Sequence, residues 1–134
     1  MMAYASAALR SPERTYRRID VAGRAAEAAN GAGLVQLLYE ELVASLRAAA
    51  FAAERANRAA KSERVTRATA ILFALEAGLD HDAGGEVSRT LASVYAGARA
   101  QVLAASLGDD PAPFRAVVAD LGEIAQAWAS VRAG

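Results

Sequence analysis

Large apolar residues recur every three or four positions along most of this chain, which is the spacing that places them on one face of an α-helix. Four segments show this pattern and are expected to form helices over residues 33–60, 62–79, 84–107 and 111–131. The first stripe is the longest and contains Leu34, Leu38, Leu42 and Leu46. Val35, Val43 and Phe51 widen it. Residues 1–30 carry no comparable stripe, and we expect a short or mobile helix there that docks loosely on the rest.

The links between the four segments are expected to be short. Lys61 stands in the first link, and Ser62 is the expected N-cap of the second helix because a serine oxygen can accept a bond from a free amide of the first turn. Residues 80–83 form the second link. In the third, Asp110 is expected to cap the last helix, since Pro111 behind it is tolerated at the first helical position.

Short links force successive helices to lie antiparallel. The chain therefore predicts an all-α fold: an antiparallel up-down-up-down four-helix bundle over residues 31–134. Residues 1–30 are predicted to form a short, mobile N-terminal cap segment, and Asn30 can cap the first helix.

The amino-acid composition argues against several classes of function. The chain has 15 basic and 15 acidic residues, and a formal net charge of zero argues against a nucleic-acid partner. No apolar run approaches the length needed to span a bilayer, so membrane insertion is not expected. The first residues lack the basic and apolar regions of a secretory signal, and cysteine is absent. These features predict a protein that stays in the cytoplasm.

Catalysis has little support in the residue pattern. His81 is the single histidine, and a metal site needs three or four ligands. Four acidic residues around the second link can bind a hard cation weakly, and they are Glu76, Asp80, Asp82 and Glu86. The alternative is that Asp82 and Glu86 favour the positive N-terminal end of the third helix. We predict no enzyme activity, no cofactor and no metal.

The chain has more large apolar residues than one stripe per helix needs, because a small bundle buries about three positions in seven. The surplus positions are Val35, Leu37, Tyr39, Ile71, Phe73, Leu103 and Leu107. The pattern allows three explanations for these surplus positions. The N-terminal segment covers them, two bundles pair through them as a weak homodimer, or they form a groove for a partner helix.

Four motifs occur in order along the chain. They are residues 16–21 (Tyr-Arg-Arg-Ile-Asp-Val), residues 34–39 (Leu-Val-Gln-Leu-Leu-Tyr), residues 79–95 (Leu-Asp, then Gly-Gly-Glu-Val, then Leu and Tyr) and Ala127-Trp128. With them the chain resembles the flagellin export chaperone family, FliS. It departs from the family pattern at residues 30–33, where Asn-Gly-Ala-Gly replaces the usual Ser-Pro before the first long helix.

The resemblance implies binding and not catalysis. It implies a cytosolic flagellar secretion chaperone that binds the disordered C-terminal region of flagellin, prevents premature polymerisation and assists export. The complex is then expected to meet a component of the flagellar export gate. A helical adaptor or regulator for another export client, or a structural homo-oligomer, remains an alternative because it needs the same surface.

The residues that we expect to contact client are Tyr16, Ile19, Leu34, Val35, Leu38, Leu91 and Tyr95. Tyr16 and Ile19 are expected to belong to the cap segment and to compete with client. The other five lie on the stripes of the first and third helices, where an ordinary place in the core is the alternative for Leu38 and Leu91.

Overall fold

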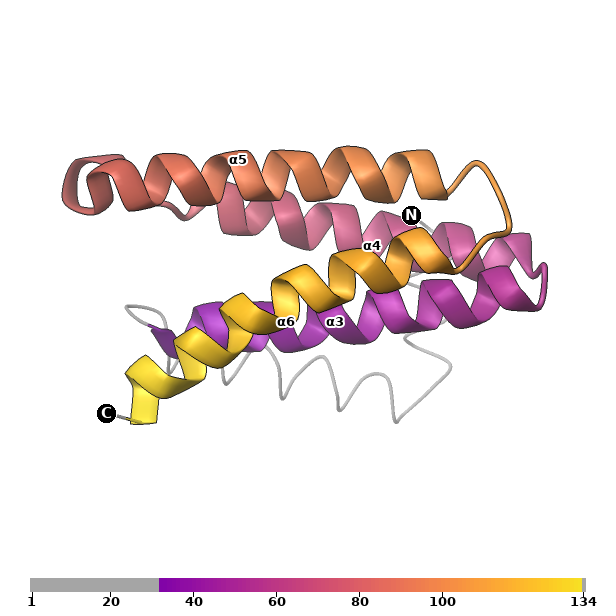
Figure 1. Ribbon diagram of the computed structural model, residues 1–134, viewed down its shortest axis with the longest axis horizontal. Helices are drawn as coiled ribbons and strands as arrows, with labels where there is room; N and C mark the ends of the chain where they lie inside the picture. Colours follow the sequence, from indigo (N-terminus) through magenta and orange to yellow (C-terminus); the bar gives the residue numbers. More distant parts are fainter. Residues whose placement is uncertain (1–31, 134) are drawn as a thin grey trace, which may run out of the picture.

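The chain folds into helices that run alternately up and down. The computed structural model describes the backbone of residues 32–133 and the side chains of residues 33–126. This part of the chain contains no strand, and its four helices are α3 (Ala32–Glu54), α4 (Arg58–Ala77), α5 (His81–Ala105) and α6 (Ala112–Ala133). α3 packs most closely against α4 and α6, and α5 lies mainly on α4 (Figure 1). The predicted all-α four-helix bundle is confirmed.

Two predictions fall on residues that the structure does not describe. These are Asn30 as a helix cap and residues 1–30 as a cap segment.

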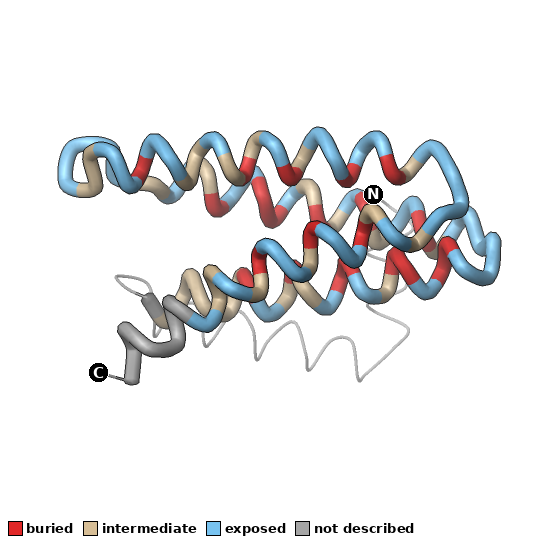
Figure 2. The backbone as a smooth tube through the Cα atoms, viewed as in Figure 1, coloured by how far each residue is buried: buried red, intermediate tan, exposed pale blue. Residues whose placement is uncertain are grey.

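The buried side chains form one stripe on each helix, and the stripes meet between the helices (Figure 2). The largest of them are Tyr39, Tyr95, Phe114, Leu42, Leu46, Leu72 and Leu121. Many of the others are alanines, which let the helix backbones approach closely. Phe51, expected to widen the first stripe, is instead 58% exposed. No helix in the described part of the chain combines the length and apolar character needed to cross a membrane.

α3 ends at Glu54, well before the predicted end of the first helix. Ala56 has a φ of 53°, in the left-handed region. The Asn57 N–H donates to the Ala52 carbonyl at 2.9 Å, and the Ala56 N–H donates to the Ala53 carbonyl at 3.0 Å. This pair of bonds is the Schellman arrangement that closes many helices. Glycine usually occupies the left-handed position of this motif, so a sequence with alanine there does not predict it.

α4 begins at Arg58 because Asn57 is its N-cap. The Asn57 side-chain oxygen accepts a hydrogen bond from the Ala60 N–H at 3.1 Å, which satisfies one of the free amides of the first turn. The predictions that Ser62 caps this helix and that Lys61 lies in the link are therefore wrong, since both residues stand inside α4.

Replacing Ala56 with glycine is expected to raise the free energy of unfolding by about 0.5–1 kcal/mol, because glycine adopts the left-handed conformation without the steric cost of a Cβ. Ala44, which is exposed within α3, provides the matched control. Ala44→Gly should lower the free energy of unfolding by about 1 kcal/mol. Urea unfolding followed by circular dichroism measures both changes. Equal losses in the two variants would contradict the left-handed turn.

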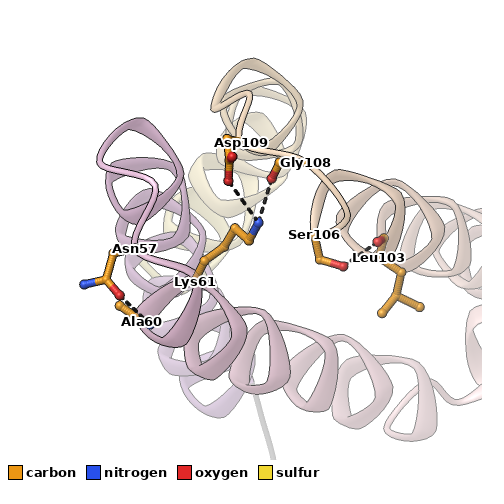
Figure 3. A network of polar contacts seen from close by, with 7 residues as sticks. All are labelled: Asn57, Ala60, Lys61, Leu103, Ser106, Gly108 and Asp109. Atoms are coloured by element: carbon orange, nitrogen blue, oxygen red, sulfur yellow. Dashed lines mark hydrogen bonds and ion pairs between the residues drawn. The ribbon is translucent and has the colours of Figure 1, made fainter.

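Lys61 ties the start of α4 to the link between α5 and α6 (Figure 3). Its side chain is only 7% exposed. The Lys61 Nζ donates to the Gly108 carbonyl at 2.6 Å and lies 3.6 Å from an Asp109 carboxylate oxygen. A buried ammonium is tolerated when it is paired and hydrogen-bonded in this way. The contact fixes the end of the bundle where α3 ends and α6 begins.

Lys61→Ala is expected to lower the free energy of unfolding by about 2 kcal/mol, because it removes both the buried stem and a charged hydrogen bond. Asp109→Asn should cost under about 0.5 kcal/mol, since the Asp109 side chain is nearly half exposed and solvent screens its charge. Denaturant midpoints of the two variants test this difference. A larger loss for Asp109→Asn would mean that the ion pair, rather than the carbonyl bond, holds the link.

α5 begins at His81, earlier than the pattern predicts, because Asp80 is its N-cap. An Asp80 carboxylate oxygen accepts bonds from the Asp82 N–H at 3.1 Å and the Ala83 N–H at 2.9 Å. The predicted link at residues 80–83 is therefore mostly helix. One turn later the helix is kinked at Gly85, whose φ of 52° and ψ of −122° suit glycine alone.

The start of α6 follows the prediction. The Asp110 carboxylate accepts a hydrogen bond from the Ala112 N–H at 2.9 Å. Asp110 therefore caps α6, as the Asp-Pro pair predicted.

Candidate functional site

Half-buried apolar side chains gather at the end of the bundle where α3 and α5 begin and α6 ends (Figures 1 and 2). Most of them pack against the core while part of their surface stays in solvent. We call this set the open-end surface, and its members are Leu34, Val35, Leu38, Leu91, Val94 and Ile124. A partner that covers them buries apolar area beyond what the fold buries by itself.

The position of the open-end surface follows from how the helices pair. Tyr39 on α3 and Tyr95 on α5 meet with their ring centroids 6.2 Å apart. Because α3 and α5 run in the same direction, Val35 and Leu91, one turn earlier on each, lie toward the same end (Figure 1). α5 packs less closely against α6 than against α4, and α5 and α6 diverge toward this end. The apolar stripes of these helices therefore end before they are fully covered.

Tyr39 and Tyr95 lie beneath the open-end surface, in the core. They are 0% and 1% exposed, and their hydroxyl oxygens lie 2.5 Å apart in a hydrogen bond. Burial raises the pKa of the Tyr95 hydroxyl, and the bond to Tyr39 lowers it by a smaller amount. Tyr95, predicted to contact client, is thus a core residue in this structure.

The structure brings several predicted contact residues together. These are Leu34, Val35 and Leu38 on α3 and Leu91 on α5, all half-buried. Their contact with a partner stays a prediction. Tyr16 and Ile19 lie outside the described residues.

Two members of the open-end surface were not predicted. Val94 and Ile124 continue the apolar stripes of α5 and α6, so the pattern marks them as apolar. It does not mark them as partly exposed, because their exposure depends on how far α5 and α6 diverge.

The surplus apolar positions divide into three groups. Val35 and Leu37 on α3 are half-buried. Phe73 on α4, Leu103 on α5 and Leu107 just after α5 are 57%, 52% and 89% exposed. Tyr39 and Ile71 are buried, and the expectation that they are surplus to the core is wrong. Some of the surplus apolar residues therefore belong to the core, and others lie on the surface.

Polar groups cover part of the exposed face of α4 and α5. The Arg99 guanidinium lies 4.1 Å from the centroid of the Phe73 ring, a cation–π distance. The same guanidinium bonds to a Glu76 carboxylate oxygen at 2.5 Å. A charged group of the same chain thus lies against the exposed Phe73 ring.

The carboxylates near the link between α4 and α5 serve the fold. Glu76 pairs with Arg99, and Asp80 caps α5. Within the described residues, no three histidine, aspartate or glutamate side chains converge as metal ligands. The alternative of a weak cation site at Glu76, Asp80, Asp82 and Glu86 is therefore not supported. The open-end surface offers apolar contact, which suits binding of a protein segment.

Known proteins resemble this chain over most of its length. A family model described as flagellar protein FliS matches residues 13–134, which include every described helix. The flagellar secretion chaperone FliS of Salmonella typhimurium is 30% identical over 99 residues, a span that covers 73% of each chain.

Proposed function

This chain belongs to the FliS family. We propose that it is a flagellar secretion chaperone whose open-end surface binds the disordered C-terminal region of flagellin. In the cytosol, this binding keeps flagellin from polymerising before export. The complex then presents its client to a component of the flagellar export gate. The role is one of binding, and the family is one of chaperones.

The half-burial of the open-end surface is the observation that carries this proposal. Most of its residues pack against the core, so the bundle holds them in place before a partner arrives. A disordered client must offset the entropy that it loses on folding, and a prearranged apolar surface supplies burial for that purpose. An amphipathic client helix with anchors three and four residues apart fits a surface built from helix ridges.

Titration with a peptide that covers about the last forty residues of flagellin from the same source tests the proposal. Isothermal calorimetry should show binding with a negative heat-capacity change, and circular dichroism should show more helix than the sum of the two components. A scrambled peptide of the same composition is the control and should give neither signal. Absence of heat and of added helix with the native peptide would overturn the proposal, and would favour another export client.

Tyr16 and Ile19 are proposed to compete with client for the open-end surface. Deletion of residues 1–21 should then raise the association rate of the flagellin peptide, because a competing segment no longer has to leave first. Stopped-flow fluorescence with a labelled peptide measures this rate. An unchanged association rate would contradict competition by residues 1–21, but it would not contradict binding of client at the open-end surface.

A further inference from the structure

The two halves of α5 are held to the bundle in different ways. The buried residues of this helix are Ser88, Tyr95, Ala98, Val102 and Ala105. Up to Tyr95 the buried side chains are Ser88 and Tyr95, which both carry a hydroxyl, and beyond Tyr95 they are aliphatic. In the first half, Val87 is 67% exposed and Leu91 and Val94 are only half-buried.

Two hydroxyl bonds help to hold the first half. The Ser88 hydroxyl donates to the Asp80 carbonyl at 2.8 Å, and the Tyr95 hydroxyl shares the 2.5 Å bond with Tyr39. The Tyr95 ring is the one large side chain of this half that is fully buried, because Leu91 and Val94 keep part of their surface in solvent. The first half of α5 therefore belongs to the part of the fold that opens most readily.

The second half of α5 is fixed more firmly. Val102 is 0% exposed in the core, with Ala98 and Ala105 one turn to either side. Arg99 in this half bonds to Glu76 and stacks on Phe73, both on α4. Opening of the first half can therefore leave the second half in place.

Glycines stand at both ends of the first half. Gly85 holds the positive-φ kink. Gly97 lies inside the helix, and a Cβ built there meets nothing within 4 Å, so packing does not require glycine at this position. Glycine inside a helix weakens it locally. The segment between these two positions can thus move with little change elsewhere.

We propose that residues 86–96, which we call the α5 flap, open away from α3 and that the Tyr39–Tyr95 hydrogen bond is the latch that keeps the flap closed. Opening exposes Tyr95, Leu91 and Val94 together and enlarges the open-end surface. The opening is a property of the free chain, while its use in admitting client rests on the proposed function.

Hydrogen exchange on the free, full-length chain tests the flap. Tyr95→Phe keeps the ring and removes the latch, so the flap amides should exchange about tenfold faster. Amides of α6 at residues 114–121 should change by less than about twofold. Parallel acceleration in both regions would show global destabilisation only, and would overturn the proposal.

A matched pair of glycine substitutions provides the opposite change. Gly97→Ala should slow exchange of the flap amides by about fivefold, because alanine stiffens the helix. Gly122 on α6 also has open space around a built Cβ, so Gly122→Ala is the control and should leave flap exchange unchanged. The same slowing in both variants would contradict a hinge at Gly97.

Binding of the flagellin peptide tests whether opening of the α5 flap has a role in client entry. If the flap admits client, Tyr95→Phe should raise the association rate by about tenfold and Gly97→Ala should lower it. Faster exchange with an unchanged association rate would overturn the role in client entry. Failure of the wild-type chain to bind the peptide would instead count against the proposed function, and the exchange experiment would still decide whether the flap opens.

Discussion

Val35→Asp is expected to weaken binding of the flagellin peptide by about 30-fold or more, the size of effect seen when a central apolar contact is lost. Val35 is a half-buried member of the open-end surface on the first turn of α3. A carboxylate at this position loses its hydration when client covers it. The apolar residues of the open-end surface provide no opposite charge to offset this desolvation free energy.

The fold should survive this change. Val35 keeps part of its surface in solvent, and α3 has no acidic residue in its first turn. A negative charge near a helix N-terminus is favourable, which offsets some of the lost packing. Circular dichroism and thermal melting should therefore stay close to those of the wild type.

Phe51→Asp is the matched control for this prediction. Phe51 stands on the same helix and is 58% exposed, but it lies toward the other end of the bundle. Calorimetry should show peptide affinity within about twofold of the wild type for this variant. Equal losses for Val35→Asp and Phe51→Asp would contradict a binding surface confined to the open end. Unfolding of Val35→Asp would assign Val35 to the core instead.

Phe114→Ala is expected to lower the free energy of unfolding by about 3–5 kcal/mol. The Phe114 ring is 0% exposed at the start of α6, at the end of the bundle opposite the open-end surface. Removing it leaves a cavity that the surrounding helices cannot close fully, so the loss exceeds the transfer free energy of the ring. Losses of this size take up a large part of the stability of a small domain.

Urea unfolding measures this loss, and Phe114→Leu provides the milder comparison. Leucine keeps most of the apolar volume and should cost less than half as much. Peptide binding by the folded fraction should be unchanged for both variants. A loss below about 1 kcal/mol for Phe114→Ala would mean that α6 contributes little to the core.

The helices and their order could be predicted from the sequence because the apolar spacing is strong in all four. Asp110 was also recognisable as a cap, since aspartate is a preferred N-cap and proline is tolerated at the first helical position. The break after α3 could not be predicted, because Ala56 takes a conformation that its residue type disfavours. Asn57 and Ser62 both qualify as caps by residue type, and only the position of that turn selects Asn57.

The candidate site was only partly predictable. Spacing identifies Leu34, Val35 and Leu91 as apolar positions on helix faces. It cannot separate a half-buried residue from a core residue such as Tyr95, because that difference depends on how closely α5 approaches α3 and α6. The hydrogen bond between Tyr39 and Tyr95 joins residues that are 56 positions apart in the chain, and no local sequence pattern predicts it.

Methyl NMR of the isotope-labelled chain with and without the flagellin peptide shows whether the open-end surface binds client. Binding should shift the methyl signals of the leucines and valines on this surface, which are Leu34, Val35, Leu38, Leu91 and Val94. The signals of Leu103 and Leu107, exposed at the other end of α5, should stay in place. Shifts at Leu103 and Leu107 with an unchanged open-end surface would contradict binding there.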